Sequence, residues 1–171
     1  MIIFGSIVFL SILIKTKASG FDVSSNEVVD YKFQNDSLLT WEAPYELQRD
    51  YAYYLSGFDD ENCPIWVAEM GKWDTRKSVE SGPLREKQFQ KYVLQFLKRC
   101  QESVQLRSTP ENPVKEFSII VDMAGYNARQ TATLPALSMA LWMARQFEQA
   151  FKDSMKLGYI VNGNYVFTTV W

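Results

Sequence analysis

The stretch 117–130 reads Phe-Ser-Ile-Ile-Val-Asp-Met-Ala-Gly-Tyr-Asn-Ala-Arg-Gln, and it decides the fold. Its β-branched run, Ile119 to Val121, is typical of a strand that is buried on both faces. Asp122 falls where that strand should end, and Gly125 and Asn127 supply turn chemistry. Because a long apolar-periodic segment follows, the stretch predicts one strand–turn–helix step of an α/β fold.

The flanking segments repeat this step. The hydrophobic pattern predicts strands at residues 64–70 and 158–161, a helix from Pro83 to about Leu106, and a second helix from about Leu134 to Phe151. The order β-α-β-α-β predicts a parallel sheet with right-handed crossovers, so both helices should cover the same face. We expect residues 45–54 to form a short helix, 56–62 a turn and 73–82 a loop.

The side-chain patterns of the two helices indicate which residues they bury. Residues of the first helix recur at three- and four-residue spacing: Phe89, Tyr92, Val93, Phe96, Leu97, Cys100 and Val104. The second helix has the predicted stripe Leu137, Ala140, Leu141, Ala144, Phe147 and Phe151, widened by Met139, Trp142 and Met143. The strands are apolar on both faces, so the face without helices needs a cover. Candidates are a missing C-terminal segment, a partner or an apolar ligand.

Composition excludes several classes of function. The chain has 171 residues, which suits one domain, with 47% hydrophobic and 22% charged residues. Its net charge is −2 and no basic block exceeds two residues, so we expect no nucleic-acid binding. The absence of His removes Ser-His and Cys-His catalysis and His-ligated metal sites. Cys63 and Cys100 are interpreted as two buried thiols, with a disulfide as the alternative.

Nucleotide signatures are weak. Residues 122–125 fit a D-x-x-G pattern, but no G-x-x-x-x-G-K-[ST] loop, G-x-G-x-x-G or G-x-S-x-G is present. Asp122 is therefore interpreted as a residue that caps the turn rather than as a Mg²⁺ ligand. We expect no nucleotide, no metal, no cofactor and no enzymatic activity.

The N-terminal segment resembles a secretory signal. Residues 2–14 form a 13-residue apolar run, too short to span a bilayer comfortably, and Ala18-Ser19-Gly20 offers small residues for cleavage. The absence of a preceding Lys or Arg leaves an uncleaved anchor or a mis-assigned start as alternatives. Residues 21–44 are interpreted as a linker, in which Asn35-Asp36-Ser37 fits a glycosylation pattern. Secretion is favoured, with a cytosolic, membrane-peripheral location as the alternative.

Several short motifs in residues 41–171 together resemble the CRAL-TRIO lipid-binding domain family, whose members transfer phospholipids, tocopherol and retinoids. They are Trp41 and Pro44; Ser56-Gly57-Phe58-Asp59; Pro64-Ile65-Trp66-Val67 leading to Gly71-Lys72-Trp73-Asp74; residues 119–125; and Gly158-Tyr159-Ile160-Val161-Asn162. The resemblance implies a partial CRAL-TRIO domain over residues 45–171. It also implies that the family's gate helix and last strands are missing, so that the sequence is a fragment of a longer protein.

The resemblance further implies a sheet with helices behind it and an apolar lipid pocket in front. The pocket residues so implied are Trp66, Ala68, Phe117, Ile119, Val121 and Trp142. The position of an acidic headgroup contact in phosphoinositide-binding members falls near Trp142, so a tocopherol-like, retinoid or isoprenoid ligand is as well favoured as a phospholipid. The implied partners are a hydrophobic lipid and, transiently, a membrane surface. The alternative is an interaction module that keeps the fold without the ligand.

Overall fold

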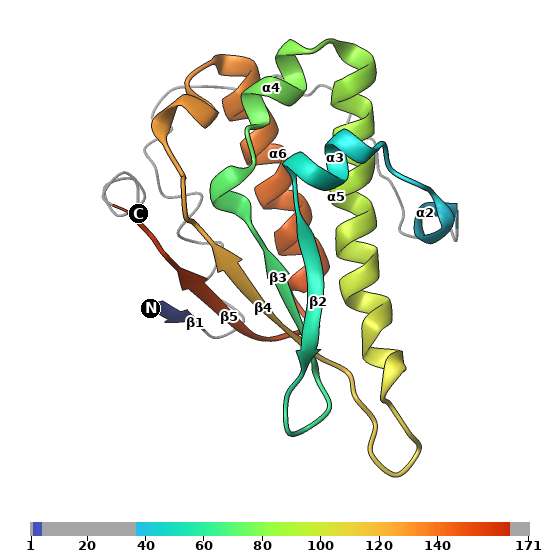
Figure 1. Ribbon diagram of the computed structural model, residues 1–171. Helices are drawn as coiled ribbons and strands as arrows, with labels where there is room; N and C mark the ends of the chain where they lie inside the picture. The colour runs from blue at the N-terminus through green and yellow to red at the C-terminus, as the bar shows by residue number, and fades with distance from the viewer. Residues whose placement is uncertain (1, 5–36, 165–171) are drawn as a thin grey trace.

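The computed structural model describes residues 2–4 and 37–164 (Figure 1). Their centre is a five-stranded sheet with the strand order β1-β5-β4-β3-β2. The strands are β1 (Ile2–Phe4), β2 (Tyr53–Phe58), β3 (Pro64–Ala68), β4 (Phe117–Asp122) and β5 (Met155–Val161). Two long helices, α5 (Pro83–Ser103) and α6 (Leu134–Phe151), lie against one face of this sheet.

The parallel core confirms the predicted α/β fold class. Strand β3 pairs with β4, and β4 with β5, both in parallel register. Helices α5 and α6 connect these strands, and because both crossovers move in the same direction across the sheet, both helices cover the same face. Ring contacts show this packing: Trp66 on β3 lies 6.1 Å from Phe96 on α5, and Phe117 on β4 lies 5.1 Å from Phe151 on α6.

Strand β2 was not predicted from the sequence, where its residues were assigned to a helix end and a turn. The helix α3 (Tyr45–Asp50) ends earlier, because Tyr51 is fully buried and its hydroxyl donates to the backbone oxygen of Asp74 at 2.9 Å. The chain then runs antiparallel to β3, with an irregularity between Leu55 and Gly57. This edge strand explains why a purely parallel reading was wrong: its outward side is too polar to show a continuous apolar run.

Two other segments also differ from the prediction. The expected loop at residues 73–82 contains the helix α4 (Thr75–Glu80), which begins after Asp74, whose Oδ1 accepts from the backbone N–H of Lys77. Four residues of the expected linker form α2 (Ser37–Thr40). Of the signal-like run, Ile2–Phe4 pair antiparallel with β5; the rest of that run and most of the glycosylation pattern lie outside the described residues.

The core confirms the predicted stripe of α5. Its Phe89, Val93, Phe96, Leu97 and Cys100 are fully buried. Each large apolar side chain of this kind contributes roughly 1.5–3 kcal/mol relative to an exposed one. Both cysteines are free and buried, as predicted, and burial raises the pKa of the Cys100 thiol well above its ordinary value.

The predicted stripe of α6 is partly wrong. The helix buries Ala136, Met139, Met143, Phe147 and Ala150, whereas Leu137 is 43% exposed and Leu141 only half-buried. The helix has two adjacent apolar stripes, and periodicity alone does not tell which one meets the sheet. Contact with the sheet selects the stripe that contains Met143 and Phe147, and this rotation leaves a row of leucines on the outside.

Candidate functional site

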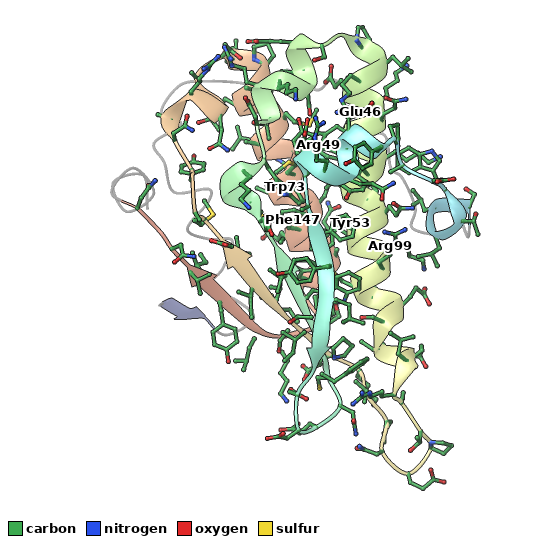
Figure 2. All side chains as sticks on the ribbon, viewed as in Figure 1. Glu46, Arg49, Tyr53, Trp73, Arg99 and Phe147 are labelled. Carbon is green, nitrogen blue, oxygen red and sulfur yellow. The ribbon has the colours of Figure 1, made fainter. Side chains whose placement is uncertain are left out.

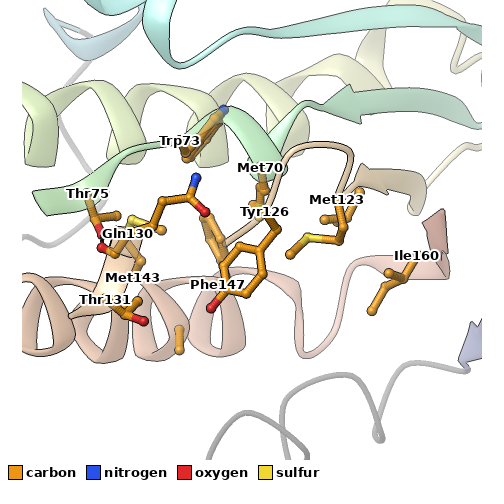
Figure 3. A pocket seen from close by; sticks show the side chains of 13 residues that line it. Met70, Trp73, Thr75, Met123, Tyr126, Gln130, Thr131, Met143, Phe147 and Ile160 are labelled. Atoms are coloured by element: carbon orange, nitrogen blue, oxygen red, sulfur yellow. Dashed lines mark hydrogen bonds between the residues drawn. The ribbon is translucent and has the colours of Figure 1, made fainter. Parts of the chain in front are cut away.

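A cavity of about 130 Å³ lies between the sheet and α6, near the carboxyl ends of β4 and β5 (Figure 3). The third wall is the 3-10 helix η1 (Met70–Lys72) with the residues that follow it. The residues lining the cavity are Met70, Trp73, Thr75, Val121, Met123, Tyr126, Gln130, Thr131, Ala140, Met143, Ala144, Phe147 and Ile160. In parallel sheets, the carboxyl ends of the strands are the usual place for a ligand.

The turn after β4 is fixed by Asp122. Its Oδ1 accepts hydrogen bonds from the backbone N–H of Ala124 and from the amide of Asn162, both at 2.9 Å. Gly125 follows with a φ of 85°, a conformation that L-residues with side chains rarely adopt. The role predicted for Asp122, capping the turn, is confirmed, and this turn places Met123 and Tyr126 at the cavity.

Gln130 joins three segments around the cavity. It belongs to the 3-10 helix η3 (Ala128–Thr131) and is 5% exposed. Its Nε2 donates to the backbone oxygen of Gly71 at 2.8 Å, and its Oε1 accepts from the backbone N–H of Asn127 at 2.9 Å. Its own backbone oxygen accepts from the Thr75 hydroxyl at 2.7 Å. These polar groups are thus hydrogen-bonded within the protein, and they hold the wall in place rather than pointing free donors at a ligand.

The remaining wall is apolar and adaptable. Trp73 and Phe147 are 2% and 3% exposed and lie on opposite sides of the site, on η1's continuation and on α6 (Figure 2). Met70, Met123 and Met143 add flexible thioether side chains that adjust to irregular shapes. The small side chains of Ala140 and Ala144 leave the space that a larger residue would fill. None of the residues lining the cavity carries a charge.

Exposure identifies the mouth of the cavity. Val121, Phe147 and Ile160 form its buried end. Tyr126, Thr131 and Ala140 are only half-buried, as is Met70. The cavity therefore opens beside η3 and the first turns of α6.

The structure brings one of the six predicted pocket residues to this cavity, namely Val121. Trp66, Ala68, Phe117 and Ile119 share its face of the sheet but lie deeper in the core beneath the helices; the indole N–H of Trp66 donates to the Ser103 hydroxyl at 2.9 Å. Trp142 is half-buried against the core and is not among the lining residues. Ligand contact by these five residues stays a prediction.

The cavity lies on the face that the helices cover, whereas the sequence-based expectation placed the pocket on the opposite face. The difference arises because α6 does not pack tightly over the ends of β4 and β5, where alanines face the sheet. Sequence reasoning missed Met70, Trp73, Tyr126 and Gln130, which belong to connections rather than to the predicted strands. Their position just after β3 and β4 was the available signal, since both connections leave the carboxyl edge of the sheet.

The described residues show no group of three or more Cys, Asp or Glu side chains positioned to hold a metal ion. None of the helices in the described part of the chain combines the length and apolarity that crossing a bilayer requires.

Comparison with known protein families gives one match. A family model described as the CRAL/TRIO domain matches residues 48–171, which is more than half of the chain. The match begins within α3 and includes every strand from β2 to β5, so it contains all the residues that line the cavity.

Proposed function

Because the chain belongs to the CRAL/TRIO domain family, whose fold is associated with lipophilic ligands, we propose that it binds a hydrophobic lipid in the cavity between β4, β5 and α6. The observation that carries the proposal is the cavity wall, which has no charged residue and whose Gln130 and Thr75 side chains already have partners within the protein. Such a wall favours an apolar occupant over a polar one.

The wall also favours the uncharged part of the lipid. An ionised headgroup placed among Met123, Met143 and Phe147 would lose its hydration without gaining a partner, which is strongly unfavourable. The part that enters is therefore an isoprenoid, retinoid or tocopherol-like end or the end of an acyl chain. An apolar cavity of about 150 Å³ in another protein stays dry and holds one benzene ring. At about 130 Å³, this cavity suits one end of a lipid, and the rest of the molecule extends through the mouth.

The proposed activity is binding or transfer without covalent chemistry. The family is generally non-catalytic. The cavity is lined by no carboxylate, lysine or cysteine that would serve as a general base or nucleophile. Trp73, Phe147 and the methionines supply contact area, which is what retention of a lipid requires.

The test uses a variant that fills the cavity. Ala144 is 3% exposed and lines the cavity, so Ala144→Leu places additional carbon atoms inside it. The control is Ala128→Leu, because Ala128 is exposed and does not line the cavity. Each full-length protein is purified from eukaryotic cells, its lipids are extracted and quantified by mass spectrometry, and its melting temperature is measured.

We expect about one lipid per wild-type and Ala128→Leu molecule, and at least a tenfold lower content in Ala144→Leu at an unchanged or higher melting temperature. Wild-type protein that carries no stoichiometric lipid would contradict the proposal and favour the ligand-free interaction module. Equal lipid content in the two variants would show that the lipid binds elsewhere.

A further inference from the structure

Three leucines are exposed at one end of the molecule. Leu84 in the first turn of α5 is 73% exposed, and Leu134 and Leu137 in the first turn of α6 are 60% and 43% exposed. Helix α4 contacts both of these helices and η3, so the three leucines belong to one continuous end of the fold, the upper end in Figure 1. We call residues 75–88 and 128–138 the mouth end. A cluster of exposed leucines is unusual on a soluble monomer and marks a surface that contacts something apolar.

The mouth end is also basic. Its two segments contain five cationic side chains and two carboxylates, a net charge of +3, whereas the whole chain carries −2. Two of the cations are paired: Arg76 with Glu80 at 3.6 Å and Lys77 with Asp50 at 2.6 Å. The other three, Arg85, Lys87 and Arg129, form no ion pair among the described residues.

The leucines continue directly into the mouth of the cavity. Leu137 lies one turn before Ala140 on α6, and Ala140 is a half-buried lining residue. Arg129 lies between Gln130 of the cavity wall and the turn after β4. A lipid that leaves the cavity here would therefore emerge among exposed leucines and cations.

We propose that the mouth end docks on an anionic lipid bilayer, with Leu134 and Leu137 inserted at the headgroup boundary and Arg129 and Lys87 facing anionic headgroups. The inference rests on the proposed function for its purpose, since docking at the mouth lets a lipid pass between bilayer and cavity without crossing water. Charge complementarity selects this partner: the same surface on a second copy would present a second set of unpaired cations, and the net negative charge of the rest of the chain would oppose contact with an anionic membrane through other faces.

Two kinds of interaction combine in this docking. Apolar side chains at the headgroup boundary and basic side chains near anionic lipids each give weak, reversible attachment. Each cation near an anionic surface strengthens binding about fivefold. Such reversible attachment suits a protein that must leave the membrane again.

The experiment measures binding of the full chain to vesicles of pure phosphatidylcholine and to vesicles with about one third phosphatidylserine, by co-sedimentation. The leucine variant is Leu134→Gln with Leu137→Gln, and the charge variant is Arg129→Gln with Lys87→Gln. The matched control is Leu106→Gln with Lys115→Gln. Leu106 is 62% exposed but lies at the opposite end of α5, roughly 30 Å from Leu84.

We expect the wild type to bind the anionic vesicles at least tenfold more tightly than the neutral ones. The leucine and charge variants should each bind the anionic vesicles at least tenfold more weakly, at an unchanged melting temperature, and the control should bind like the wild type. Absence of wild-type binding, or equal weakening in the control, would overturn the docking surface. A dimer that dissociates in the leucine variant while no variant binds vesicles would overturn it in favour of a second copy. Ala144→Leu separates the two proposals, because it removes lipid from the cavity and leaves vesicle binding unchanged.

Discussion

Gly71 is the residue whose replacement the structure constrains most sharply. A Cβ added at Gly71 would lie 2.3 Å from the backbone oxygen of Ala124 and 2.4 Å from the carbonyl carbon of Met123. These are backbone atoms of the turn after β4, so they do not rotate away as a flexible side chain would. In Gly71→Ala, η1 and this turn must move apart, and the hydrogen bond from Gln130 to the Gly71 oxygen must lengthen or break.

The free-energy cost has two parts. Overpacking against a rigid neighbour costs about 1–3 kcal/mol. Leaving the buried Gln130 amide without its partner costs about 1–3 kcal/mol more. The sum, roughly 2–5 kcal/mol, corresponds to a fall in melting temperature of about 5–15 °C for a chain of this size. Because Met70, Met123 and Gln130 line the cavity, lipid content should fall as well.

The matched control is Gly57→Ala, because a Cβ at Gly57 meets no atom within 4 Å. We expect that variant to keep its melting temperature within a few degrees, since alanine loses less backbone entropy on folding. Thermal unfolding followed by circular dichroism measures both. Equal shifts in the two variants would refute the argument that close contact at Gly71 holds η1 against the β4 turn.

Three further expectations follow from single residues. Ile119→Asp places a charge on a fully buried face and should cost more than about 4 kcal/mol or prevent folding; Ile120→Asp on the half-buried opposite face should cost less than half as much in urea unfolding, and equal costs would show that the two faces are equally buried. The side-chain hydrogen bond from Arg49, with help from a nearby lysine, lowers the pKa of Asp50 from 3.8 to about 2, so its ionised form favours the folded state. That contribution is present above about pH 4 and is lost as pH falls to about 2; Asp50→Asn should flatten this part of the stability profile, and an unaltered profile would contradict it. Cys100 is fully buried with a raised pKa, so a thiol reagent should label it only after unfolding, and rapid labelling of the native protein would show that this part of the core opens.

The sequence predicted the elements that are long or uniformly apolar. Strand β4, with Ile119 to Val121, and helix α5 have one strong period each, and both were found close to their actual bounds. Strand β2 was missed because one of its sides is polar and its register shifts near Gly57. Such an edge strand depends on its partner β3, which periodicity within a single segment does not reveal.

The candidate site was less predictable than the fold. The strand face that holds Val121 was identified correctly as apolar, but the same pattern describes core residues such as Ile119 and Phe117. What separates a cavity from a core is whether the opposite element fills the space, and here Ala140 and Ala144 of α6 leave it open. The polar frame of Gln130 joins residues 59 positions apart and has no local sequence signature.

The central claim is that a lipid lies between β4, β5 and α6, and photolabelling tests it most directly. The full chain is loaded with an uncharged long-chain alcohol that carries a diazirine, irradiated, digested and mapped by mass spectrometry. The account predicts covalent label on Met123, Met143 or Phe147, and loss of that label in Ala144→Leu. Label concentrated instead on Ile65 and Ile120, on the opposite face of the sheet, and retained in Ala144→Leu, would contradict it.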